Sequence, residues 1–100
     1  KNMEDLYVTL ADDASFVLSM NVSAIIMVET SNLYGGCLFF ATYQSTTVVE
    51  LADPANQCAP TDTDGGVAVY KGNTTDVLTI KNRHGSTKNF SIQVIHGRGL

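Results

Sequence analysis

Apolar and polar side chains alternate with a period of two along almost the whole chain. Leu6, Val8 and Leu10, for example, are separated by Tyr7 and Thr9. This period is typical of β-strands, and the many β-branched residues in the apolar segments support it. No 11-residue stretch keeps the apolar spacing of an amphipathic helix. We therefore predict strands within residues 6–10, 16–20, 21–29, 37–43, 46–51, 67–71, 76–81 and 89–96.

About eight short strands separated by turn residues predict an all-β fold, an antiparallel β-sandwich or barrel. The 100 residues suffice for one core, so we expect a single domain over 1–100, with 96–100 as a flexible tail or connection. Hydrophobic residues make up 44% and charged residues 16% of the chain, which argues against disorder. Because the chain begins at Lys1 without an initiator Met or a signal-peptide pattern, we expect a processed product or an excised segment.

Charge and hydropathy exclude two classes of partner. The net charge of −4 is unfavourable for a general nucleic-acid binder. The longest unbroken apolar stretch, Ala24–Val28, is far shorter than the roughly 20 residues that a membrane helix needs, so we expect no membrane insertion.

The charge is distributed unevenly. Residues 1–70 carry nine acidic residues against one basic residue, and residues 71–100 carry five basic residues against one acidic residue. Such asymmetry can steer an anionic ligand, or it can attract a neighbouring copy in a ring, acidic flank against basic flank. The third interpretation is that these side chains are simply solvated.

The two cysteines, Cys37 and Cys58, allow one disulfide, which would close a loop of about 20 residues and contribute about 3 kcal/mol. Because Cys37 lies in an apolar, strand-like run, the favoured interpretation is a small buried thiol, with the bridge as the alternative. The cysteines and the two histidines, His84 and His96, show no ligand spacing, so we predict neither a metal site nor a cofactor.

Two predicted strands are apolar on both faces. In residues 22–28 and 37–43 one alternating set would fill the core, and the other set consists of Ile25, Met27, Leu38 and Phe40. Apolar side chains on a second face need cover, and in a chain this short a second subunit provides it most economically. We therefore predict that these four residues form an oligomer interface. The alternative is that the irregular segment 52–66 folds over them.

The sequence predicts no enzyme. Residues 61–66 begin like a calcium loop, but the following Val67, Ala68 and Val69 provide no closing carboxylate, so a glycine turn is expected there. Neither histidine accompanies a nucleophile in a Gly-flanked elbow, and we expect no catalytic residues.

The turn 82–88 concentrates donors at one rim of the predicted sandwich. Loops of this kind present binding groups, so an anionic glycan is a candidate ligand. The candidate ligand-binding residues are Tyr70, Lys71, Arg83, His84 and Lys88. The alternative is an ordinary hairpin turn in which Asn82 and Gly85 serve the backbone conformation.

Three short motifs occur in a fixed order. Leu10–Ala14 precedes an alternating strand, a Gly-rich turn leads into Leu-Phe-Phe within residues 35–40, and an Asn-Arg-x-Gly turn at 82–85 precedes a closing strand with Phe90. In these motifs residues 6–96 resemble the C-terminal domains of bacteriophage tail-fibre and related virion appendage proteins. The segment 52–66 and the Gly97–Gly99 tail depart from that pattern.

The resemblance implies a jelly-roll-like β-sandwich that forms a homotrimer on the virion. Its role would be host recognition at a fibre tip, or that of a head fibre or capsid decoration. The expected partners are further copies of the chain, other virion proteins and, at a fibre tip, host surface polysaccharide. The alternative function is a lectin-like sandwich that binds an anionic glycan through the 82–88 turn.

Overall fold

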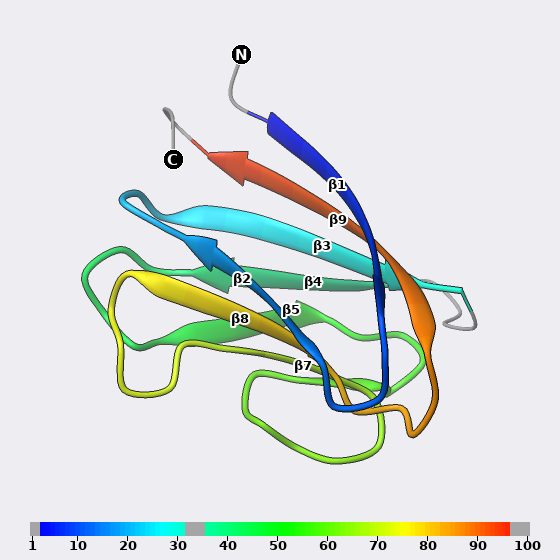
Figure 1. The fold of residues 1–100 in the computed structure, drawn as a ribbon. Helices are drawn as coiled ribbons and strands as arrows, with labels where there is room; N and C mark the ends of the chain where they lie inside the picture. The colour runs from blue at the N-terminus through cyan, green and yellow to red at the C-terminus, as the bar shows by residue number, and fades with distance from the viewer. Residues whose placement is uncertain (1–2, 32–35, 97–100) are drawn as a thin grey trace.

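A computed structural model describes residues 3–31 and 36–96, which form two β-sheets packed face to face (Figure 1). The strands are β1 (Met3–Leu10), β2 (Ser15–Ser19), β3 (Ala24–Thr30), β4 (Cys37–Ala41), β5 (Val48–Ala52), β6 (Cys58–Ala59), β7 (Val67–Tyr70), β8 (Val77–Asn82) and β9 (Lys88–His96). The all-β sandwich predicted from the alternating pattern is thus confirmed. Residues 97–100 of the predicted tail lie outside the described residues, as does Gly35 of the Gly-rich turn.

The larger sheet has the strand order β1-β9-β3-β4-β5, and the smaller sheet the order β2-β8-β7-β6. The outer strands of the sequence pair in a nested way, β1 with β9 and β2 with β8, as in a jelly roll. The nesting stops at β3, because β3, β4 and β5 follow one another as a meander in the same sheet. All pairings are antiparallel except that of β6 with β7.

The structure has one strand more than the eight predicted, and the additional strand is β6. It lies in the segment 52–66, where the sequence pattern indicated irregular chain. It is two residues long and offers no alternation that a pattern could detect. Its approach to β7 requires glycine at position 66, because a Cβ there would overlap the carbonyl oxygen of Gln57. That oxygen accepts a hydrogen bond from the N–H of Val67 at 2.8 Å.

The core lies between the two sheets. Alternate residues of β3, namely Ala24, Ile26 and Val28, point inward and are buried, as the period of two requires. The largest fully buried side chains come from both layers, including Phe39 and Phe90 of the larger sheet and Leu78 and Ile80 of the smaller one. In the described ranges no helix is long and apolar enough to cross a membrane.

Asn82 closes one end of the sandwich. Its side chain is fully buried, and its Nδ2 donates to the carbonyl oxygens of Leu10 and Ser86, both at 2.8 Å. Its Oδ1 accepts the N–H of His84 at 2.9 Å. Asn82 therefore joins the end of β1 to the turn between β8 and β9 through its buried side chain, whereas the hairpin alternative assigned it only to the backbone conformation of that turn.

Cys37 and Cys58 form a disulfide, with their Cα atoms 6.6 Å apart. The prediction of a free thiol at Cys37 was therefore wrong, although its burial was predicted correctly. The error arose because the apolar neighbours of Cys37 show that it is buried but not what faces it. The segment after β5 carries Cys58 across to the smaller sheet, and the disulfide joins β4 of one sheet to β6 of the other.

Candidate functional site

The outer face of the larger sheet brings the four predicted interface residues together. Ile25 of β3 lies opposite Phe40 of β4, and Met27 lies opposite Leu38. These side chains point away from the core because their neighbours in the sequence, such as Ile26 and Phe39, fill it. The two-sided strands are therefore real, and their second face is a continuous apolar surface.

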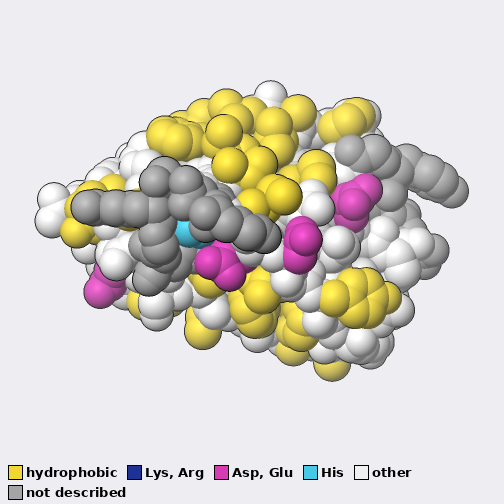
Figure 2. Space-filling view, turned by 90° about the horizontal axis from the view of Figure 1, so that it is seen from above, with side chains coloured by type: hydrophobic (Ala, Val, Ile, Leu, Met, Phe, Trp, Pro, Cys, Tyr) yellow, Lys and Arg dark blue, Asp and Glu magenta, His cyan; other side chains and the backbone are white. Residues whose placement is uncertain are grey.

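This surface extends across the sheet beyond those four residues. Ile95 of β9 lies beside Ile25 on one side, and Val49 of β5 lies beside Phe40 on the other. We name the whole set the apolar face. It comprises Met3, Ile25, Met27, Leu38, Phe40, Val49, Leu51 and Ile95. Figure 2 shows hydrophobic side chains gathered along the upper border of that view, with acidic side chains below them.

The segment 52–66 does not cover the apolar face. Ile25, Val49, Leu51 and Ile95 remain 36%, 42%, 51% and 48% exposed. The segment instead crosses to the smaller sheet, where it contributes β6. Ala52 and Pro54 at its start do line a cavity with Met27 and Leu38, so the segment reaches one border of the face. The structure therefore does not support the alternative in which the segment 52–66 folds over the apolar face.

The remainder of the same sheet face is polar. Gln93 of β9 donates from Nε2 to Oδ1 of Asp5 at 3.0 Å, which marks the border with the apolar face. Beyond this pair, Tyr7, Glu29 and Ser91 line a shallow cavity with a volume of about 240 Å³. The outer face is thus divided along the strands into an apolar half and a polar half.

Arg83 of the predicted basic turn is already surrounded by carboxylates. Its Nη1 lies 3.0 Å from Oδ1 of Asp13, its Nε 3.4 Å from Oδ1 of Asp62, and its Nη2 3.8 Å from Oδ1 of Asp64. The neighbouring Lys81 lies 3.2 Å from Oδ2 of Asp62. An anionic ligand would have to displace these carboxylates. The C-terminal basic residues therefore serve in part to neutralise the acidic part of the same chain.

Lys71 is not presented at the surface. Its side chain is buried, and its Nζ donates to the carbonyl oxygens of Thr42, Ser45 and Thr75 at 2.6, 3.0 and 2.8 Å. Burial lowers the pKa of Lys71, and the charge of Asp76 opposes that shift. The ammonium group therefore fastens the turn between β4 and β5 to the turn between β7 and β8.

The structure does not bring the five predicted ligand-binding residues into one site. Tyr70 and Lys71 lie at the end of β7, where they line a cavity with Pro60 and Asp62. Arg83 and His84 follow β8, whose last residue lies opposite the first residue of β7. Because β7 and β8 are antiparallel, the two groups occupy opposite ends of the smaller sheet. Lys88 begins β9 on the side of the Arg83 group.

Replacement of Lys71 tests its structural role. We expect Lys71→Met to lower the free energy of unfolding by about 2 kcal/mol, because three carbonyl oxygens lose a charged donor. Water can partly replace that donor, since the three carbonyls belong to turns near the surface. Chemical denaturation of the variant measures the change. Unchanged stability would show that the three hydrogen bonds contribute nothing net.

His84 makes the free energy of unfolding depend on pH. Burial, and then the charge of Lys88, lowers the pKa of His84, and its Nε2 is buried without a hydrogen-bond partner. Below the unfolded-state pKa of about 6.5 the unfolded chain takes up this proton more readily than the folded chain. Stability is therefore lost as the pH falls below that value.

We expect the melting temperature to fall less between pH 7.5 and 5.5 in His84→Gln than in the wild type. The direction of this difference follows from the lowered pKa of His84 in the folded chain. Parallel pH profiles for the two proteins would contradict the assignment. Calorimetry at several pH values makes this comparison.

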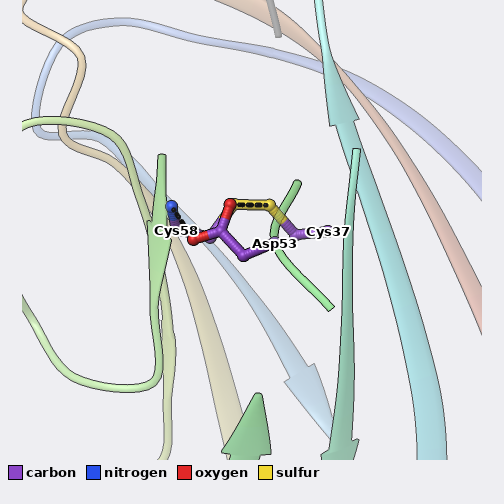
Figure 3. Close-up of side chains that lie close together, drawn as sticks. All are labelled: Cys37, Asp53 and Cys58. Atoms are coloured by element: carbon purple, nitrogen blue, oxygen red, sulfur yellow. Dashed lines mark hydrogen bonds between the residues drawn. A yellow bond between two sulfur atoms is a disulfide. The ribbon is translucent and has the colours of Figure 1, made fainter. Parts of the chain in front are cut away.

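Asp53 organises the chain around the disulfide, and the sequence analysis missed it. Its Oδ1 accepts the N–H of Gln57 at 2.9 Å. Its Oδ2 accepts the N–H of Cys58 at 3.0 Å (Figure 3). An Asp before Pro54, a few residues ahead of a cysteine, is the sequence signal for such a turn. Burial, and then the adjacent Asp53, raises the pKa of Glu50 on β5.

Comparison with known proteins gives no match to a protein-family model, a curated protein or a solved structure. The resemblance to bacteriophage appendage domains therefore stays a prediction from short sequence motifs. What the chain does has to be argued from its surfaces, of which the apolar face is the most extensive.

Proposed function

We propose that this chain is a non-enzymatic structural and attachment module of a bacteriophage virion that assembles as a homotrimer. The observation that supports assembly is the apolar face, which crosses all five strands of the larger sheet and keeps five of its large side chains at least one-third exposed. Contiguous apolar surface of this kind marks interaction sites in soluble proteins.

The face suits association with further copies of the chain. It lies on regular strands, so its side chains are held in fixed positions before association, and little order has to be gained on binding. Three such faces can converge on a threefold axis, where each shields the other two from water. The resemblance of residues 6–96 to virion appendage domains supports the threefold symmetry and the virion as the location.

Attachment at a fibre tip would add host surface polysaccharide to the partners, and either location adds other virion proteins. The lectin-like alternative receives less support, because the carboxylates of Asp13, Asp62 and Asp64 surround Arg83, and Lys71 is buried. We therefore propose assembly as the primary role and assign no glycan-binding residue.

Sedimentation equilibrium or light scattering of the purified chain tests the proposal. We expect a mass of about 32 kDa, three times the 10.7 kDa of one chain. A mass of about 11 kDa at concentrations well above micromolar would overturn it, because the apolar face would then be stable in water. A dimer mass would retain assembly but contradict the threefold symmetry.

A further inference from the structure

Three potential metal ligands converge between the sheets: Cys37 of β4, Asp53 just after β5 and Cys58 of β6 (Figure 3). One ligand atom from each residue lies within 4.8 Å of the other two. Oδ1 of Asp53 lies 3.5 Å from Sγ of Cys37. Spacing in the sequence gave no sign of this group, because two of its members are 21 positions apart.

We propose that, when the disulfide is reduced, Cys37, Cys58 and Asp53 bind one zinc ion that joins the two sheets in its place. A small dithiol reductant supplies the two electrons: it becomes a cyclic disulfide, and the two cysteines become thiols. Zinc then binds both sulfurs as thiolates and releases their two protons. This inference does not depend on the proposed function.

The observed distances suit tetrahedral zinc. Zn–S bonds of about 2.3 Å and Zn–O bonds of about 2.0 Å at the tetrahedral angle place sulfur and oxygen about 3.5 Å apart. That is the separation of Asp53 Oδ1 and Cys37 Sγ. Two thiolates on one ion lie about 3.8 Å apart. Rotation of the cysteine side chains can provide this separation, because the Cα atoms are already 6.6 Å apart.

The carboxylate is oriented before any metal arrives. The N–H groups of Gln57 and Cys58 each bind one oxygen of Asp53, at 2.9 and 3.0 Å. Each carboxylate oxygen has a second lone pair available for a metal. Ligating carboxylates are usually held by hydrogen bonds of this kind, which fix their direction and strengthen binding.

The site is accessible from solvent. Cys37 is buried, but Asp53 and Cys58 are only half-buried. Cys58 lines a cavity of about 180 Å³ with Gln57, Ala59 and Gly66, so a reductant or an ion can approach the disulfide at that cysteine. Three protein ligands leave the fourth tetrahedral position to water.

Metal titration of the full chain tests the proposal. The chain is reduced with dithiothreitol, freed of reductant without oxygen and titrated with Co²⁺, a spectroscopic substitute for zinc, and then with Zn²⁺. We expect one equivalent of Co²⁺ to bind with thiolate-to-cobalt absorption in the near-ultraviolet, and Zn²⁺ to displace it. Zn²⁺ should also raise the melting temperature of the reduced chain, or restore its β-sheet circular dichroism if reduction unfolds it.

Two variants and the oxidised chain complete the test. Asp53→Asn should lower the affinity for Zn²⁺ at least about tenfold. Asp76→Asn should leave it unchanged, because Asp76 is exposed in the turn between β7 and β8, at the other end of β7 from its pairing with Cys58. The oxidised chain should bind no Co²⁺ with thiolate absorption. Equal affinity in Asp53→Asn and the wild type, or no stoichiometric uptake by the reduced chain, would overturn the proposal.

Discussion

Met27→Asp is expected to convert the proposed homotrimer into folded monomers. Met27 lies on the apolar face next to its polar border, with Leu38 opposite it on β4 and Gln93 on β9. In the single chain an aspartate at this half-buried position keeps contact with water. In the assembly it becomes a buried charge without a partner, which costs several kcal/mol for each copy. A cost of about 4 kcal/mol weakens association about a thousandfold.

The control for this substitution is Val17→Asp. Val17 is 59% exposed and lies on β2 of the smaller sheet, away from the apolar face. Sedimentation should show a monomer for Met27→Asp and a trimer for Val17→Asp, and circular dichroism should show both to be folded. If Met27→Asp remains a trimer, the apolar face is not the interface. If the wild type is itself a monomer, the proposed assembly is already overturned.

Asn82→Ala is expected to lower the free energy of unfolding by about 3 kcal/mol or more. The alanine side chain leaves two carbonyl oxygens and one N–H without their partner at a fully buried position. Each unsatisfied buried group costs about 1–3 kcal/mol. Because a domain of this size is stable by roughly 5–15 kcal/mol, the loss is a large fraction of the total.

Asn89→Ala is the matched control. Asn89 lies near the start of β9 and, unlike Asn82, is exposed. Its Oδ1 accepts one hydrogen bond from Thr9 at 2.7 Å. We expect a loss below about 1 kcal/mol in this variant. Denaturant titrations of the two variants should therefore differ clearly. Equal losses would mean that the buried network at Asn82 contributes no more than an exposed hydrogen bond.

The strands could be predicted because each one carries its own signal. In β3, for example, the side chains alternate between core and outer face, and the apolar residues on both faces indicated a surface in need of cover. Strand β6 could not be predicted in this way, because two residues cannot show a period. Its position depends on the glycine at 66 and on the disulfide, which are contacts between distant parts of the chain.

The surroundings of the basic residues could not be predicted for the same reason, because their partners are distant in the sequence. Arg83 and Lys71 looked like surface groups because nothing near them in the sequence indicates partners. The carboxylates around Arg83 come from residues 13, 62 and 64, and the carbonyls around Lys71 come from two turns. Only the folded chain brings these groups together. Asp53 is the exception, since its turn is local and could have been predicted.

The nested pairing of β1 with β9 affects the order in which the protein can form. Strand β9, the last of the described strands in the sequence, is placed between β1 and β3, so Met3 meets Ile95 across the sheet. Until β9 has emerged, β1 has no neighbour in its sheet. This high contact order predicts slow folding of the larger sheet, which has to wait for β9, and intolerance of truncation at β9, whereas helical chains of equal length can fold from local contacts.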